Sequence, residues 1–257
     1  MVIHLPEGDA VGTPLPAADR PLLEAVRVER WFGQQPAVRG VDFSLSSGEF
    51  LVLFGPNGAG KSTLLRMLAG SLRPTRGEIL LAGSSADADM RAADWRRRVG
   101  VLSHQTYLYG YLTARENLRF FGRLYGLRRL DERVDQLLEE VGLTDRQGDR
   151  VRTFSRGMQQ RLALARTLLH NPEMVLLDEP YTGLDPHAAV MLRRLLERLR
   201  DGRRTILMVT HNLSQGLELA TRVAIQSTGR WVLDEPRGAI DASSFERLYT
   251  RLLDQVP

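Results

Sequence analysis

The sequence predicts an α/β fold with a mainly parallel core sheet, a small antiparallel β subdomain and an inserted helical subdomain. Through the last third of the chain, short apolar segments typical of strands alternate with helical segments, which is the order of a parallel sheet with crossover helices. Helical segments between about residue 90 and about residue 165 interrupt two strand-rich parts, so they are expected to form an insertion. A glycine-rich segment between an apolar strand and a helix is the third indication.

Strands are expected first. Residues 24–32 begin the ordered, strand-rich part, residues 41–54 form two strands around the turn at 46–48, and residues 77–83 form another strand. Helical periodicity then marks the segments 92–99, 112–127 and 130–143. The final alternation consists of a strand at 174–180, a helix at 186–200, a strand at 205–210 and a helix at 213–220.

Composition sets the class of protein. The chain has 257 residues, 43% of them hydrophobic, which is enough for one domain with a sizeable core. Residues 1–20 lack an apolar period and are expected to be a flexible tail, so the domain spans 21–257. No apolar run approaches the ~20 residues of a membrane helix, and no secretory leader opens the chain. We therefore expect a soluble protein that is not exported from the cytoplasm.

The charged residues and the missing cysteines exclude other functions. The net charge is +4, and arginine is interleaved with acidic residues along the helices, which is typical of solvated faces. We therefore expect no nucleic-acid partner. Without cysteine the chain has no disulfide and no thiolate metal site.

The glycine-rich segment matches the pattern G-x-x-x-x-G-K-[ST] and contains Lys61, the only lysine of the chain. Its glycines allow successive backbone N–H groups to point at phosphate oxygens, and the helix that follows adds its positive N-terminal end. Lys61 supplies a compact charge at the rim of the loop, and Ser62 is expected to hold Mg²⁺. The alternative is an ordinary glycine turn. The predicted nucleotide-binding residues are Gly55, Pro56, Asn57, Gly58, Ala59, Gly60, Lys61, Ser62 and Thr63.

A pair of acidic residues ends a four-residue apolar strand. Asp178 is expected to hold Mg²⁺ through water, and Glu179 is the candidate base for an attacking water. The alternative is that both carboxylates only cap the next element. The same tripeptide recurs at 234–236 in a hairpin-like setting without the buried run, so Asp234 and Glu235 are interpreted as surface carboxylates.

The segment 153–172 resembles the signature region of the ABC-type ATPases, a family of P-loop NTPases. Ser155, Gly157 and Gln159 occupy positions of the family's LSGGQ motif, although Arg156 and Met158 replace a glycine and a glutamine. The resemblance covers residues 21–235. It implies further site residues, namely Asp185 in the D-loop, His211 as the switch histidine, Phe32 stacked on adenine and Gln105 on Mg²⁺.

Two of these assignments have competitors. In ungapped register the expected Q-loop glutamine falls on His104, one residue before Gln105. Trp31 neighbours Phe32, and Phe32 could instead belong to the core.

The resemblance also implies a mechanism and partners. Two chains would close head to tail on ATP and Mg²⁺, with Lys61, Glu179 and His211 as the catalytic residues. Separate transmembrane permease subunits would dock on an aromatic segment at 106–112, unless its tyrosines pack in the core, and the chain would lie at the cytoplasmic face of the cell membrane. The segments around 103–127 and 154–169 are most similar to the ATP-binding subunit of a haem exporter for cytochrome c biogenesis. The alternative is a soluble ABC-type ATPase of iron–sulfur cluster assembly or another role outside transport.

Overall fold

A six-stranded sheet forms the core of the computed structural model, which describes residues 21–85 and 92–255. The predicted tail at 1–20 lies outside the described residues. The strand order is β10-β9-β3-β8-β7-β6, and all neighbours are parallel except β9 and β10. These strands are β3 (Phe50–Phe54), β6 (Val99–Leu102), β7 (Met174–Asp178), β8 (Thr205–Val209), β9 (Arg222–Ser227) and β10 (Arg230–Pro236). The predicted, mainly parallel core sheet is confirmed.

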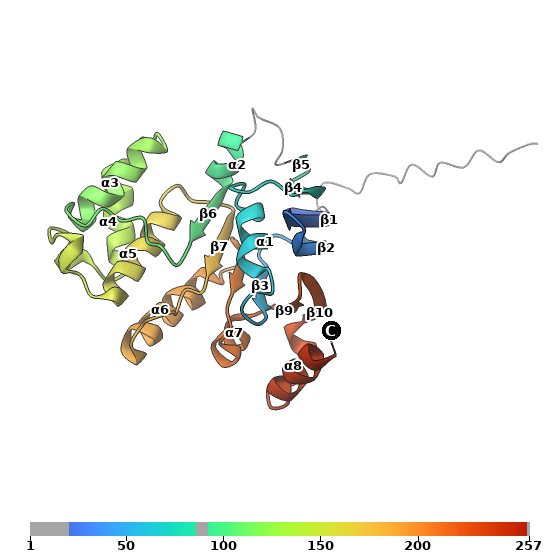
Figure 1. Cartoon of the computed structure of the whole chain (residues 1–257). Coiled ribbons are helices and arrows are strands. Elements are labelled where there is room, and N and C mark those ends of the chain that lie inside the picture. The colour runs from blue at the N-terminus through green and yellow to red at the C-terminus, as the bar shows by residue number, and fades with distance from the viewer. Residues whose placement is uncertain (1–20, 86–91, 256–257) are drawn as a thin grey trace, which may run out of the picture.

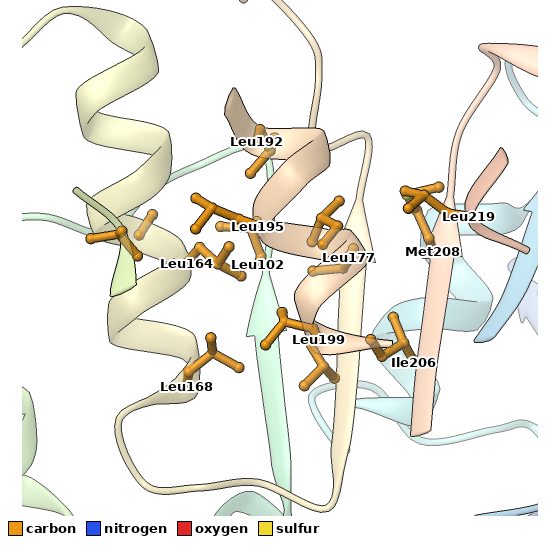
Figure 2. Packing of buried hydrophobic residues seen from close by; sticks show 14 of the residues in the cluster. Leu102, Leu164, Leu168, Leu177, Leu192, Leu195, Leu199, Ile206, Met208 and Leu219 are labelled. Atoms are coloured by element: carbon orange, nitrogen blue, oxygen red, sulfur yellow. The ribbon is translucent and has the colours of Figure 1, made fainter. Parts of the chain in front are cut away.

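Both faces of this sheet are covered, which explains why its strands are almost continuously apolar. Alternate residues of β3 point to opposite faces of the sheet and belong to different hydrophobic clusters. Phe50, Val52 and Phe54 belong to the first cluster, and Leu51 and Leu53 belong to the second. The first cluster includes α5 (Arg156–Leu168), α6 (Pro186–Leu199) and α7 (Leu213–Leu219), and Figure 2 shows leucines of α5 and α6 beside those of β6 and β7. The second cluster lies between the sheet, α1 (Lys61–Leu68) and a smaller sheet.

The smaller sheet is antiparallel, as predicted, with the order β2-β1-β4-β5. Its strands are β1 (Leu23–Phe32), β2 (Gln35–Leu45), β4 (Arg76–Leu81) and β5 (Ser84–Ser85). The two strands expected within 41–54 are both present, but β2 and β3 belong to different sheets. The turn at 46–48 therefore joins two layers of the molecule.

The helices α3 (Ala114–Leu124) and α4 (Leu130–Glu140) pack against α5 beside the main sheet (Figure 1). A capping box begins α3, because Thr113 accepts a hydrogen bond from the Glu116 backbone while the Glu116 carboxylate accepts one from the Thr113 backbone. One part of the expected helical insertion is different. After α2 (Ala92–Arg98), residues 99–102 form β6 at the edge of the core sheet. The sequence did not predict this strand, because a four-residue apolar run has no periodicity that would distinguish a strand from a helix.

The chain ends in a helix that the sequence interpretation did not identify, α8 (Phe245–Asp254). Phe245 anchors it, with its ring centroid 5.3 Å from that of Phe54 at the end of β3. Short 3₁₀ helices lie at Thr144–Arg146, Val151–Thr153 and Arg237–Ala239. Within the described ranges, no helix has the length and apolar character that crossing a membrane requires.

Candidate functional site

The glycine-rich loop joins the end of β3 to the start of α1. It needs glycines because its backbone adopts positive φ angles and because neighbouring backbone carbonyl oxygens leave no room for a Cβ. Gly55 and Gly60 have φ angles of 155° and 95°. A Cβ on Gly55 would lie 2.2 Å from the Gln226 carbonyl oxygen, and one on Gly60 would lie 2.0 Å from the Ala37 carbonyl oxygen. The first turn of α1 has neither a side-chain cap nor an acidic residue, so its N–H groups remain available to an anion.

Gln226 on β9 contacts this loop and helps to hold its backbone in place. The sequence interpretation did not identify this residue. Its side chain is fully buried on β9, and its Nε2 donates a hydrogen bond of 2.8 Å to the Ala59 carbonyl oxygen. A glutamine inside the apolar run of a strand was the available signal, because most buried polar side chains form a hydrogen bond.

Lys61 is buried rather than placed at the rim of the loop, which corrects the prediction. Only 7% of the residue is exposed, and its Nζ donates hydrogen bonds of 2.7 and 2.8 Å to the carbonyl oxygens of Gly55 and Pro56. Burial lowers the pKa of Lys61, and the negative charges of Glu179 and Asp178 oppose this shift. The predicted cation and the predicted acid pair therefore belong to one site.

Ser62 and Asp178, the two residues predicted to hold magnesium from α1 and β7, are in contact. The Ser62 hydroxyl donates a hydrogen bond of 3.2 Å to Oδ1 of Asp178. Burial raises the pKa of the Asp178 carboxyl, whereas the hydrogen bond from Ser62 lowers it. A hydroxyl and a carboxylate are oxygen ligands that suit Mg²⁺, which usually takes its remaining ligands from water and phosphate. Among the described residues there is no group of three or more His, Cys, Asp and Glu side chains that could hold a metal.

Glu179 is held by groups that follow the neighbouring strand β8. Its Oε1 lies 2.9 Å from Nδ1 of His211, and its Oε2 accepts a hydrogen bond of 3.3 Å from the Thr210 hydroxyl. The Glu179 backbone has a φ of 49°, a left-handed conformation that is strained for a residue with a side chain. Thr210 is a further residue that sequence reasoning missed, since nothing in its local pattern indicates a partner in the segment that follows β7.

His104 and Gln105 are both exposed and line, together with Asp178, a cavity of about 370 Å³. Positive charge on His104 acts to lower the pKa of Asp178, which places this side chain near the acid pair. Gln105 lines the same cavity, but no hydrogen bond to Ser62 or Asp178 is found for it within the described part of the chain.

The predicted signature residues lie at the start of α5. Ser155 is the N-cap and accepts a hydrogen bond of 3.3 Å from the Met158 backbone N–H. Gly157 is buried against α6, where an added Cβ would lie 2.6 Å from Cβ of Ala188, and Gln159 donates to the Phe154 carbonyl oxygen. Figure 1 and the two clusters place α5 and α1 on opposite faces of the sheet, so one chain does not bring these residues to the glycine-rich loop.

The remaining candidates lie where local sequence predicted. Asp185 caps α6 by accepting a hydrogen bond of 2.8 Å from the Ala188 N–H, with Pro186 at the first helical position. Phe32 ends β1 and is 49% exposed, which excludes a place in the core, and the Arg30 guanidinium lies 4.8 Å from its ring centroid. Trp31 is also exposed, at 39%.

Comparison with known proteins gives one consistent result. The sequence pattern of the family described as "ABC transporter" matches residues 38–182. The ABC transporter ATP-binding protein NatA of Bacillus subtilis (strain 168) is 39% identical over 80% of this chain and 83% of its own length. The Nod factor export ATP-binding protein I of Rhizobium meliloti (strain 1021) is 37% identical over 91% of this chain and 70% of its own.

Solved structures agree with these relatives. An ATP-binding subunit of an ABC transporter superposes with a TM-score of 0.79 at 30% identity, covering 90% of this chain and 99% of the other. The ATP-binding cassette MJ0796, solved as a dimer in a post-hydrolysis state with ADP and Pi, gives a TM-score of 0.75 at 26% identity, covering 84% and 98%.

Proposed function

Because the chain belongs to the ABC transporter family and is an ATPase of that family, we propose that it is the subunit whose ATP hydrolysis drives an exporter. One observation carries the catalytic part of this proposal. The contact between Glu179 and His211 lies next to the contact between Ser62 and Asp178, and the charges of both carboxylates act on Lys61. A base, an orienting histidine, magnesium ligands and a cation are thus assembled at one phosphate-binding loop.

We assign the roles in hydrolysis as follows. The loop 55–63 binds the phosphates through its N–H groups, and Phe32 offers an exposed ring for stacking on adenine. Glu179 orients and deprotonates the attacking water while His211 holds the carboxylate in place. Ser62, Asp178 and Gln105 are the candidate ligands for Mg²⁺, which would offset negative charge on the phosphates.

Lys61 needs one rearrangement for this role. Its Nζ is bonded to two carbonyl oxygens of its own loop, and these hydrogen bonds must give way for the ammonium group to reach phosphate oxygens. The compact ammonium on a flexible stem can make this exchange without moving the backbone.

A second copy of the chain would complete the site. The helices α5 and α6, which begin at the signature residues Ser155, Gly157 and Gln159 and at Asp185, pack on the face of the sheet opposite α1. We therefore propose that these residues face ATP held by the other copy, head to tail. The dimer formed by MJ0796 supports this arrangement.

The membrane partner is proposed to be a pair of transmembrane permease subunits, with this chain at the cytoplasmic face of the cell membrane. The tyrosines of the segment 106–112 support it, because Tyr107, Tyr109 and Tyr111 are 60%, 49% and 78% exposed. These residues are not packed in the core and are available for docking. We propose that 21–257 act as one domain, with the helical subdomain at about 90–165 carrying this surface.

Export is favoured by the relative named for Nod factor export. Haem as the cargo finds no support in the relatives described above, and no observation on the described residues favours iron–sulfur assembly.

The function is tested by replacing the base and its sequence duplicate. Glu179→Gln should reduce steady-state ATP hydrolysis by about a hundredfold or more, the range for loss of a positioned general base. Glu235→Gln is the matched control, because Glu235 sits in the same Asp-Glu-Pro tripeptide but is exposed on β10. Hydrolysis by Glu179→Gln at the wild-type rate would refute the assignment. Capture of an integral membrane protein that stimulates the ATPase tests the transport part.

A further inference from the structure

Gln226 is a polar side chain in the apolar interior, on the strand β9 that pairs with β3. The residues before it on β9, Val223, Ala224 and Ile225, are fully buried, and Gln226 is itself 0% exposed. Its Nε2 donates to the Ala59 carbonyl oxygen, whereas its Oε1 is buried and has no hydrogen-bond partner within the described residues. A buried oxygen without a partner destabilises a fold, so an apolar residue of the same size would be more favourable for the stability of this core.

The glycine-rich loop contacts both the backbone and the side chain of Gln226. A Cβ on Gly55 would lie 2.2 Å from the Gln226 carbonyl oxygen, and a Cβ on Gly60 would lie 2.8 Å from Nε2 of Gln226. The Ala59 carbonyl oxygen also accepts a hydrogen bond of 3.0 Å from the backbone N–H of Gly229, in the turn between β9 and β10. Both donors to this carbonyl therefore come from the hairpin of β9 and β10, which sets its direction.

The direction of the Ala59 carbonyl decides where the next N–H group points. No cis peptide bond occurs in the described part of the chain, and in a trans peptide the C=O and the N–H point to opposite sides. With the carbonyl held toward Gln226, the Gly60 N–H points away from β9, and it donates to no group among the described residues. Gly60 is the N-cap of α1, a place where free backbone N–H groups bind anions.

We propose that Gln226 is a positioning residue for nucleotide binding, which aims the Gly60 N–H at a phosphate oxygen by holding the Ala59 carbonyl. The inference rests on the proposed phosphate-binding role of the loop 55–63. Because Gly60 has no side chain, the peptide before it rotates easily unless its carbonyl is held. The hydrogen bond from Gln226 is therefore expected to contribute to nucleotide affinity rather than to the stability of the fold, for which the free Oε1 is unfavourable.

Gln226→Met separates affinity from stability, because methionine is unbranched, of similar length and unable to donate to a carbonyl. Titration with mant-ADP, a fluorescent ADP, measures the dissociation constant, and a thermal melt without nucleotide measures stability. The variant should bind mant-ADP about fivefold more weakly, the effect of losing one hydrogen bond. It should melt at the wild-type temperature or above, because the unpaired Oε1 is removed and the Ala59 oxygen keeps the Gly229 donor.

The kinetics of ATP hydrolysis give a readout that a purely structural role would not change. The loop holds the phosphates in the ground state and in the transition state alike, so the KM of Gln226→Met for ATP should rise by a similar factor while kcat changes less. A lower kcat with an unchanged KM would overturn the proposal, as would a wild-type affinity of Gln226→Met for mant-ADP.

Thr205→Val is the matched control, because Thr205 is also buried on a strand beside β3 but lies at the other end of β3 from the loop. Its hydroxyl donates to the Ser46 carbonyl oxygen and accepts from the Gly48 N–H, in the turn before β3. This variant should melt at a lower temperature and bind mant-ADP like wild type. Equally weakened binding in Thr205→Val and Gln226→Met would show a general effect of the core and overturn the proposal.

Gln226→Glu is a second variant of nearly the same shape, in case the methionine variant does not fold. An ionised carboxylate opposes its oxygen to that of Ala59, whereas the protonated acid can donate to it. Burial raises the pKa of a carboxyl group, so binding of mant-ADP should be weak near pH ~8 and recover in part near pH ~6. Binding like that of wild type at both pH values would contradict the proposal. Failure of wild type to bind mant-ADP would instead contradict the proposed function, so the two failures are distinguishable.

Discussion

At the scale of single residues, Lys61 stands out because it is the only lysine beside many arginines and is buried in its own loop. Lys61→Arg should abolish ATP hydrolysis almost as completely as Lys61→Ala. The planar guanidinium is too broad to replace an ammonium group that donates hydrogen bonds to the carbonyl oxygens of both Gly55 and Pro56. Loss of an aligned contact to the transition state costs on the order of 3 kcal/mol, about a hundredfold in rate.

Steady-state ATPase assays with a thermal melt measure this effect. Because Lys61 is buried, both variants should also melt at a lower temperature, so nucleotide-free stability must be compared with activity. Near wild-type hydrolysis by Lys61→Arg would show that positive charge alone suffices at this position.

His170, which follows α5, predicts a pH effect on stability. Its ring stacks on Tyr125 with centroids 4.1 Å apart, and burial together with the charges of Arg166 and Arg133 lowers the pKa of His170 to about 4. The His170 side chain takes up a proton near pH ~6.5 in the unfolded chain but not in the folded chain. The contribution of the neutral, buried ring to the free energy of unfolding is therefore fully present above that pH and is lost as the pH falls toward the folded pKa. His170→Phe removes the titration and keeps the stack.

Melting temperatures near pH ~7 and ~5 test this prediction. The decrease in melting temperature on acidification should be smaller in His170→Phe than in wild type. His187→Phe is the control, because His187 is exposed on α6, and it should fall as much as wild type. Equal falls in all three proteins would contradict a buried neutral histidine.

At the scale of elements, the contact between α5 and α6 depends on Gly157. Gly157→Ala would bring two Cβ atoms to 2.6 Å unless the helices move, which should lower the free energy of unfolding by about 1–2 kcal/mol. The gain in helix propensity is smaller, since Gly157 lies in the first turn. Adding Ala188→Gly should restore part of the loss.

Urea unfolding of the two single variants and the double variant measures this coupling. Strictly additive effects would show that the helices do not touch at this point. If the double variant regains stability but fails to form the ATP-dependent dimer, Gly157 also has the proposed role toward the phosphate of the other copy.

At the scale of the whole molecule, the separation of α5 from the glycine-rich loop predicts ATP-dependent assembly. The wild-type chain should be mostly monomeric, and Glu179→Gln should form a dimer with ATP, because bound ATP is then not hydrolysed and continues to join the two surfaces. Light scattering with and without ATP measures the mass. A mass of Glu179→Gln that does not respond to ATP would contradict the shared site.

The sequence by itself determined the features that depend on neighbouring residues. Periodicity and apolar runs predicted most strands and helices, and the glycine spacing predicted the loop at 55–60. Asp185 followed by Pro186 is a pattern typical of a helix start, and it begins α6. The acid pair could be distinguished from its duplicate at 234–235, because only Asp178 ends a buried strand, whereas Asp234 forms an exposed ion pair with Arg222. These patterns are local, so the sequence contains them directly.

Tertiary structure alone decided which distant residues meet. The parallel register of β7 and β8 brings His211 and Thr210 to Glu179, and the position of β9 beside β3 puts Gln226 under the loop. Burial of Lys61 beside the acid pair likewise depends on elements far away in the chain. Strand order and register are chosen by the packing of both faces of the sheet, a property of the whole chain that no local segment encodes.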